Sequence, residues 1–108
     1  MKFSKAFSKV ARGDGRLFYR RVQNLMFPVT LNRVTASLAR YPEDARLSYT
    51  LSLDGAEVAK DTASAKSPFV ADLGIRLRRG ERTFVFSAEG FEPHQLVEGT
   101  IEIDFGLF

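Results

Sequence analysis

The stretch Leu47-Ser48-Tyr49-Thr50-Leu51-Ser52-Leu53-Asp54-Gly55 decides the fold of this chain. Large apolar residues alternate with hydroxyl residues up to Leu53, and successive positions of a β-strand face opposite sides of the sheet. The pattern therefore predicts a strand with one buried face. The Asp-Gly pair favours a tight hairpin turn, because both residues tolerate positive φ, and residues 56–60 then supply the returning strand.

More strands are predicted downstream of this hairpin. Residues 82–88 and 95–105 alternate apolar and polar side chains, and residues 68–78 form a further strand in which Gly74 is a candidate bulge. The segments between them carry the polar, glycine and proline residues of connections. Such connections are predicted at residues 61–67, 79–81 and 89–93.

Upstream of the hairpin the patterns are less regular. Residues 16–22 are rich in aromatic and β-branched side chains, although both faces carry charge. Residues 28–40 combine helical and alternating spacings, and their β-branched content favours a strand, which a turn at Tyr41-Pro42-Glu43-Asp44 would end. A chain of 108 residues is expected to form one domain. We therefore predict an all-β fold, a single antiparallel β-sandwich of about seven strands over residues 16–108.

A family resemblance accompanies this pattern. The stretch from Leu53 to Val58, and the later stretch from Leu77 to Pro93, resemble bacterial and phage immunoglobulin-like sandwich modules in the part of the chain from residue 45 to residue 105. The chain departs from the immunoglobulin pattern in having neither cysteine nor tryptophan. The resemblance implies a sandwich fold and a tendency to bind other proteins, and it implies no chemistry.

The first fifteen residues are predicted to be a basic arm outside the sandwich. Phe3, Phe7 and Val10 have the spacing of one face of a short helix, and Gly13-Asp14-Gly15 breaks whatever precedes it. A helix of this length needs a partner surface to become ordered. We expect the arm, helical or extended, to be dispensable for folding.

Charge is distributed unevenly along the sequence. Residues 1–40 contain nine basic side chains and one acidic side chain, whereas residues 41–108 contain seven basic and twelve acidic ones. The chain can therefore attract an anionic partner, or the acidic part of another copy, with its basic part. The candidate interface residues of the basic part are Phe3, Lys5, Phe7, Lys9, Arg12, Arg16, Arg20 and Arg21. Those of the acidic last strand and the apolar tail are Glu98, Glu102, Asp104, Leu107 and Phe108, the tail packing either on its own domain or on a neighbour.

Most catalytic and cofactor chemistry lacks a signature here. The chain has no cysteine, its single histidine, His94, follows Pro93 in a predicted loop, and no phosphate-binding or nucleophile motif is present. The acids of the last strand could hold Ca²⁺, but a solvated outer face is the preferred interpretation. A carbohydrate-binding sandwich would need an exposed aromatic platform, for which Tyr19, Tyr41 and Phe91 are the candidates. We expect no enzyme, no cofactor and no metal.

The remaining patterns suggest a structural role. We expect a non-enzymatic assembly subunit of a larger particle, such as a capsid-decorating, head-joining or tail-associated protein of a bacteriophage virion, with other protein subunits and copies of itself as partners. Synthesis in the cytoplasm without a signal peptide is expected, because the N-terminus lacks an uninterrupted apolar run, and no apolar stretch is long enough to span a membrane. The alternative is a module that binds nucleic acid or another polyanion through the basic segment.

Overall fold

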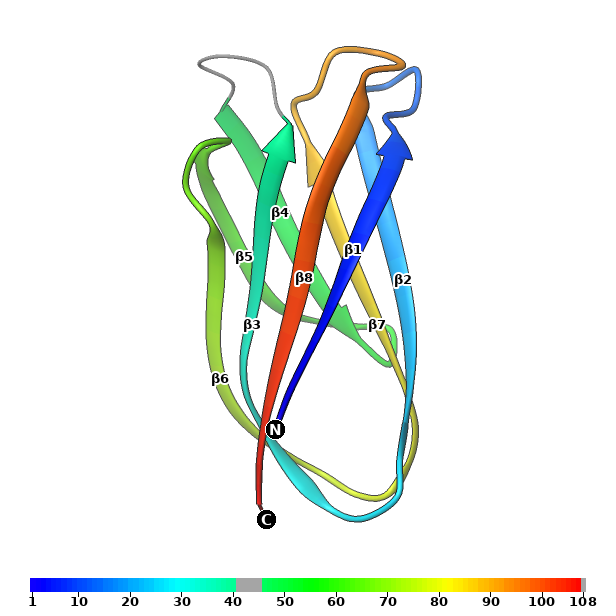
Figure 1. The fold of residues 1–108 in the computed structure, drawn as a ribbon, viewed down its shortest axis with the longest axis vertical. Coiled ribbons are helices and arrows are strands. Elements are labelled where there is room, and N and C mark those ends of the chain that lie inside the picture. The colour runs from blue at the N-terminus through cyan, green and yellow to red at the C-terminus, as the bar shows by residue number, and fades with distance from the viewer. Residues whose placement is uncertain (41–45, 108) are drawn as a thin grey trace.

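The computed structural model describes residues 1–40 and 46–107, and this part of the chain is all-β. Two four-stranded antiparallel sheets pack face to face (Figure 1). The strands are β1 (Lys2–Val10), β2 (Arg16–Leu25), β3 (Val29–Arg40), β4 (Arg46–Leu53), β5 (Ala56–Ser64), β6 (Phe69–Leu77), β7 (Gly80–Glu89) and β8 (Leu96–Leu107). The predicted antiparallel sandwich is thus confirmed, whereas the turn predicted at residues 41–44 and the last residue, Phe108, lie outside the described residues.

The strand order gives the sandwich its topology. The first sheet has the order β1-β8-β3-β6 and the second sheet the order β2-β7-β4-β5. Consecutive strands are neighbours in one sheet at the β4–β5 hairpin, whereas the other connections join strands of different sheets. Eight described strands in two such sheets form a jelly roll. The order differs from that of an immunoglobulin domain, in which the first strand pairs with the second.

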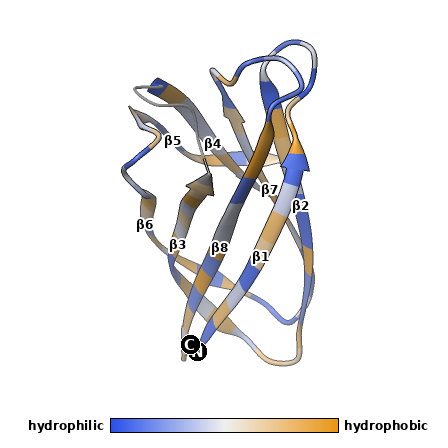
Figure 2. Ribbon diagram, turned by 45° about the horizontal axis from the view of Figure 1, so that its top comes forward, coloured by the Kyte–Doolittle hydropathy of each residue, from blue (hydrophilic) through white to orange (hydrophobic). Residues whose placement is uncertain are grey.

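The core lies between the two sheets. Apolar and polar residues alternate along the strands, as the banded colouring of Figure 2 shows. The ring of Tyr49 stacks on those of Phe69 and Phe86, with centroid distances of 5.3 and 5.8 Å. The predicted inward positions of the strands at 47–53, 82–88 and 95–105 are buried as expected, because their strict alternation leaves one register with the apolar side chains inside.

A bulge explains the mixed spacing of β3. Leu31 and Val34 are both fully buried although they are three positions apart, an odd spacing that would put them on opposite faces of a regular strand. The pairing register shifts between Leu31 and Arg33 relative to both neighbouring strands, β6 and β8. On β6 the shift coincides with Gly74, whose φ of 66° is in the region that favours glycine, so the predicted bulge is confirmed.

The N-terminal segment is an edge strand of the sandwich, so of the helical and extended alternatives the structure has the extended one. β1 pairs with β8 from Lys2 to Val10. Phe3 contacts Phe105 edge-to-face at 5.8 Å, and Phe7 packs against Tyr19 at 5.3 Å. A spacing of four residues places two side chains on one side of either a helix or a strand, which is why the pattern was ambiguous. The segment therefore belongs to the sandwich, and we expect its removal to expose part of the core.

The hairpin predicted at Asp54-Gly55 is confirmed. Both residues have positive φ, 50° and 86°, as required in a two-residue turn that matches the right-handed twist of the strands it joins. The Asp54 carboxylate accepts hydrogen bonds from the backbone N–H of Thr83 and from the Arg82 guanidinium, both at 2.9 Å. These two donors, the Thr83 N–H foremost, hold the pKa of Asp54 below its usual value of 3.8.

The first prediction concerns the hydroxyl of Tyr49, which is buried without a hydrogen-bond partner in the described part of the chain. Burial accordingly raises the pKa of Tyr49. Tyr49→Phe should leave the free energy of unfolding unchanged or raise it by about 1 kcal/mol, because the variant removes an unsatisfied group from the core. Urea unfolding measures this, with Tyr19→Phe as the control. A loss above about 1 kcal/mol would mean that the hydroxyl has a partner, such as a buried water.

The second prediction concerns acid stability. Since the pKa of Asp54 is lowered by folding, the carboxylate stabilises the fold above its unfolded pKa, and this contribution is lost as the pH falls through the folded value. Asp54→Asn preserves the turn preference and should weaken the fall in stability below about pH 4. Unfolding curves recorded from about pH 2 to about pH 7 measure this effect, because that interval contains the ionisation range of a carboxyl group. Asp61→Asn, on the same hairpin, is the control, and equal pH profiles for wild type and Asp54→Asn would refute the assignment.

Candidate interaction surfaces

β1, β2 and the connection between them lie along one side of the sandwich and carry six basic residues besides Lys2 (Figure 1). We call this surface the basic edge, and its residues are Lys5, Lys9, Arg12, Arg16, Arg20 and Arg21. Arg16 pairs with Glu89 at 3.1 Å. The other five have no carboxylate within 4.0 Å among residues 1–40 and 46–107. Arg20 and Arg21 are on opposite faces of β2, and the role of these cations as an interface stays a prediction.

The lysines of the basic edge occupy inward-facing positions. Lys5 and Lys9 alternate with Phe3 and Phe7, so they share the core side of β1. Across the gap on β2, the Arg21 side chain is half-buried, and its Nη1 atom has no hydrogen-bond partner among the described residues, while Nη2 donates to Gln23 at 3.3 Å. Inward-pointing charge on an edge strand discourages pairing with another chain. The two edge strands on this side are thus poorly suited to sheet extension.

Two of the three acidic residues of β8 lie close to cations of their own chain. Glu102 lies 3.8 Å from Lys2, and Asp104 lies 3.9 Å from the terminal amino group of Met1. Arg33 binds Asp72 on β6, and this contact, with a smaller effect of Asp104, raises the pKa of the guanidinium. Glu98, Glu102 and Asp104 are half-exposed on the outer face of the first sheet. Part of the charge polarity expected to act between copies is therefore neutralised within one copy.

Four large apolar side chains are exposed at the end of the sandwich where the chain begins and ends (Figure 1). We call this surface the apolar end, and its residues are Met1, Met26, Phe27 and Leu107. Met26 and Leu107 are 78% and 85% exposed. A small groove of 90 Å³ is lined by Met1, Met26 and Phe27 together with core residues and the polar Gln23 and Asn24. Leu107 adjoins the groove, because it pairs with Val29, which also lines it.

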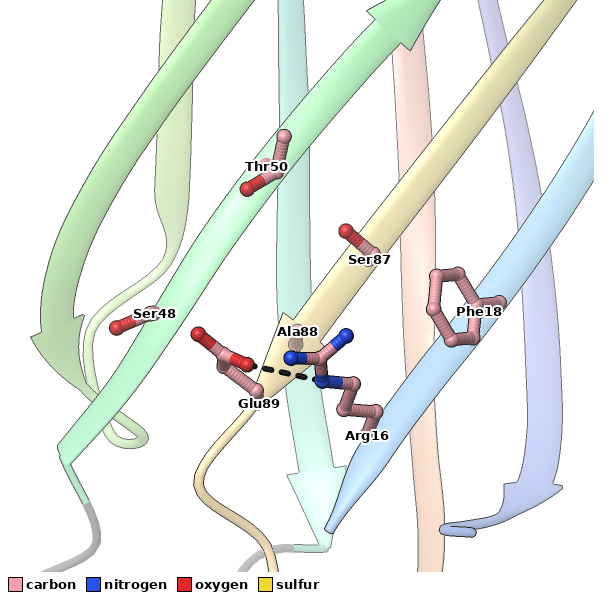
Figure 3. A pocket seen from close by; sticks show the side chains of 7 residues that line it. All are labelled: Arg16, Phe18, Ser48, Thr50, Ser87, Ala88 and Glu89. Carbon is pink, nitrogen blue, oxygen red and sulfur yellow. Dashed lines mark ion pairs between the residues drawn. The ribbon is translucent and has the colours of Figure 1, made fainter. Parts of the chain in front are cut away.

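The outer face of the second sheet is hollowed near one end of β7. This trough, of 190 Å³, is lined by Arg16, Phe18, Ser48, Thr50, Ser87, Ala88 and Glu89. Figure 3 shows the Arg16–Glu89 ion pair at one side, the Phe18 ring on β2, and the hydroxyl groups on the two central strands, β4 and β7. Phe18 is 40% exposed, and the Arg12 guanidinium lies 5.4 Å from the centre of its ring.

The predicted interface residues differ in exposure. Phe7 is buried in the core, whereas Phe3 is partly buried and lines the groove at the apolar end. Leu107 is exposed as the prediction requires, and Phe108 lies outside the described residues. Sequence reasoning missed Met26 and Phe27, although two large apolar residues before Pro28, in a connection between strands, are a readable signal. It also missed Phe18, because it could not tell whether Phe18 or Tyr19 faces outward.

The residues considered for catalysis, metal binding or sugar binding differ in exposure. His94 is exposed in the connection between β7 and β8. No group of three or more His, Asp or Glu side chains in the described residues could hold a metal ion. Of the candidate sugar platforms, Tyr19 and Phe91 are buried, and Tyr41 lies outside the described residues. Over the same residues the structure contains no helix with the length and apolar character of a membrane span.

Comparisons with known proteins place the chain in the class of β-sandwich proteins. No protein-family model and no curated protein sequence matches it. A solved structure of the carbohydrate-binding module CBM36 in complex with calcium and xylotriose matches with 13% identity and a TM-score of 0.55, over 98% of this chain and 99% of the other. A structure of infectious bursal disease virus, Gx strain, matches with 9% identity and a TM-score of 0.43, over 98% of this chain and 33% of the other. At these identities the likeness concerns the fold, and the first match, which extends over both chains, supports it.

Proposed function

We propose that the chain is a non-enzymatic structural subunit that associates with other protein subunits, including copies of itself, in a larger particle. Its setting is a bacteriophage virion, in which it decorates the capsid, joins the head or associates with the tail. The observation that carries this proposal is the apolar end, where Met1, Met26, Phe27 and Leu107 are exposed together. A contiguous apolar patch on a small soluble domain marks an interaction site.

The sheet edges support the same interpretation, because they are protected against strand pairing and so leave the ends of the sandwich as the surfaces suited to association. β1 carries inward-facing Lys5 and Lys9, and the edge strands on the opposite side, β5 and β6, contain register irregularities at residues 57–59 and 72–75. Inward charges and bulges both oppose edge-to-edge pairing of strands. Association through the apolar end avoids these obstacles, because it uses side chains and no backbone pairing.

The occupant of the apolar end is the same surface of a second copy. An isologous contact brings identical patches together, so the exposed methionine, leucine and phenylalanine side chains of one copy meet those of the other. Apolar side chains leave water in such a contact whatever the charge on the rest of the chain. Burial of apolar surface is also insensitive to ionic screening, which separates this contact from one made by the basic edge.

The third prediction tests this association. The combined variant Met26→Ser and Phe27→Ser should shift the wild-type protein from oligomer to monomer in sedimentation velocity, while circular dichroism stays that of a sandwich. The matched control is Val10→Ser with Val70→Ser, which removes two other exposed apolar side chains, 58% and 43% exposed, from the faces of the first sheet. A wild-type protein that stays monomeric over the whole concentration range, at low and high salt, would refute self-association through this end.

A second candidate function is polyanion binding, and a specific observation favours it. Five cations of the basic edge have no carboxylate partner in the described part of the chain, although the acids of β8 lie in the same sheet as β1. Phosphate or sulfate groups of a polyanion could neutralise them and release counterions. The unpaired cations are Lys5, Lys9, Arg12, Arg20 and Arg21.

The fourth prediction tests the polyanion candidate by its salt dependence. With about five phosphate contacts, affinity for arbitrary DNA should fall by roughly two to three decades between 50 and 200 mM salt. Arg12→Glu with Arg20→Glu should abolish binding, measured by fluorescence anisotropy. Arg78→Glu with Arg79→Glu, at the connection between β6 and β7, reverses equal charge away from the basic edge and is the control. Equal losses in the two double variants would show attraction to net charge and no site at the edge.

A further inference from the structure

The floor of the trough on the second sheet is made of hydroxyl groups that have no partner within the described residues. Ser48 and Thr50 on β4 and Ser87 on β7 point outward and are half-buried. None of these three hydroxyls makes a hydrogen bond within the described residues. Each offers one donor and two acceptor positions. The floor therefore presents several hydrogen-bonding groups at fixed spacing on the two central, best-anchored strands of the sheet.

The walls of the trough differ in character. On the β2 side stands the exposed ring of Phe18, and at one end the Arg16 guanidinium lies 3.1 Å from the Glu89 carboxylate (Figure 3). The Arg16 guanidinium and the Glu89 carboxylate are planar groups, and each can make paired hydrogen bonds to neighbouring hydroxyls of a ligand. Few cavities on a small domain combine an aromatic surface with convergent polar groups, and this combination is typical of ligand sites.

The ligand chemistry that fits this lining is that of a saccharide. A sugar ring has an apolar C–H face that can lie on an aromatic ring, while its rim of hydroxyls both donates and accepts hydrogen bonds. Phe18 can contact the first feature, and Ser48, Thr50 and Ser87 can pair with the second. An apolar ligand would leave these hydroxyls unpaired, which costs free energy when water is displaced from them.

The surrounding charge selects among saccharides. Arg16 is compensated by Glu89, but Arg12, beside the Phe18 ring, and Arg20, two residues further along β2, have no carboxylate within 4.0 Å in the described part of the chain. The rim of the trough thus carries uncompensated positive charge on its β2 side. A carboxylate on the sugar would pair with either guanidinium, as charge-assisted hydrogen bonds favour.

The same arrangement fits nucleic acid less well. A polynucleotide carries a phosphate at every residue and is held by cations that follow its backbone along a groove. Here the free cations flank one wall, while the floor on β4 and β7 is made of neutral hydroxyls. Hydroxyl-rich recognition around one aromatic ring suits a short length of acidic sugar better than a phosphate chain.

We infer that the trough is a binding site for an acidic saccharide, in which Phe18 supports the sugar ring, the hydroxyls of Ser48, Thr50 and Ser87 bind its rim, and Arg12 or Arg20 pairs with a uronate carboxylate. The inference is independent of the apolar end, which lies at the termini, and so it does not rest on the proposed assembly function. A subunit of a particle that also holds a glycan would attach the particle to a saccharide-coated surface.

The test titrates the full chain with trigalacturonate and follows backbone amide shifts by NMR. Shifts should concentrate on β2, β4 and β7 around the trough. Phe18→Ala, which removes the aromatic wall, and Thr50→Leu, which fills the floor, should each weaken binding at least about tenfold, a loss of roughly 1.4 kcal/mol. Val22→Ala, an exposed apolar change on the same face of the same strand, is the matched control and should leave binding unchanged.

Two further ligands make the outcome decisive. Neutral trigalactose should bind at least about tenfold more weakly than trigalacturonate, and the Arg12→Glu and Arg20→Glu pair should abolish the difference. A thymidine hexanucleotide that shifts the amides of the same trough residues and binds with higher affinity than the saccharide would overturn the inference in favour of nucleic acid. No shift at millimolar trigalacturonate would overturn it outright. All of these variants should sediment as the wild type does, so failure here and failure of the assembly proposal are distinguishable.

Discussion

The pairing of the first strand with the last is the contact on which the rest of this structure depends. β1 lies antiparallel to β8 over its whole length, and β8 also pairs with β3, so the last strand becomes an inner strand of the first sheet. The contact is permitted at one point by Gly99, because a Cβ atom there would lie 2.8 Å from the Phe7 ring and 2.5 Å from a backbone oxygen. With β8 in place, the remaining crossings between sheets produce the jelly-roll order.

The pairing of β1 with β8 also determines which basic groups lie close to the acids of β8. Lys2 and the terminal amino group are brought beside Glu102 and Asp104, so the outer face of the first sheet carries compensating charges. Within the described residues, the cations of the basic edge gain no such partner from β8. They are the inward-facing Lys5 and Lys9 together with the arginines of β2 and of the connection before it. Surface ion pairs of this kind add little stability. Their effect is to concentrate the unpaired positive charge on one edge, which gives both the polyanion hypothesis and the rim of the trough their physical basis.

A feature of this fold could be predicted when the residues that determine it are neighbours in the sequence, and could not when they are far apart. Asp54-Gly55 and the alternation of β4, β7 and β8 are local, so the hairpin and the buried faces could be predicted. β1 could not, because Phe3 and Phe7, four residues apart, satisfy a helix and a strand equally, and the partner strand lies about ninety residues further on, beyond any local pattern. Strand order is likewise non-local, which is why a jelly roll and an immunoglobulin-like sandwich could not be distinguished. The trough was missed because it forms only where β2, β7 and β4 lie side by side.

The apolar end and the trough occupy different parts of the molecule, and neither could be inferred from the likeness of the fold to other structures. One β-sandwich fold can support many unrelated sites. Function in such a fold resides in the few positions that the core does not constrain, namely the outward-facing residues and the connections. In this chain the connection before Pro28 and the chain ends supply apolar side chains, whereas the outer face of the second sheet supplies hydroxyls and one aromatic ring. Because these surfaces share no residue, the proposed partner at the apolar end would leave the trough open for the proposed ligand.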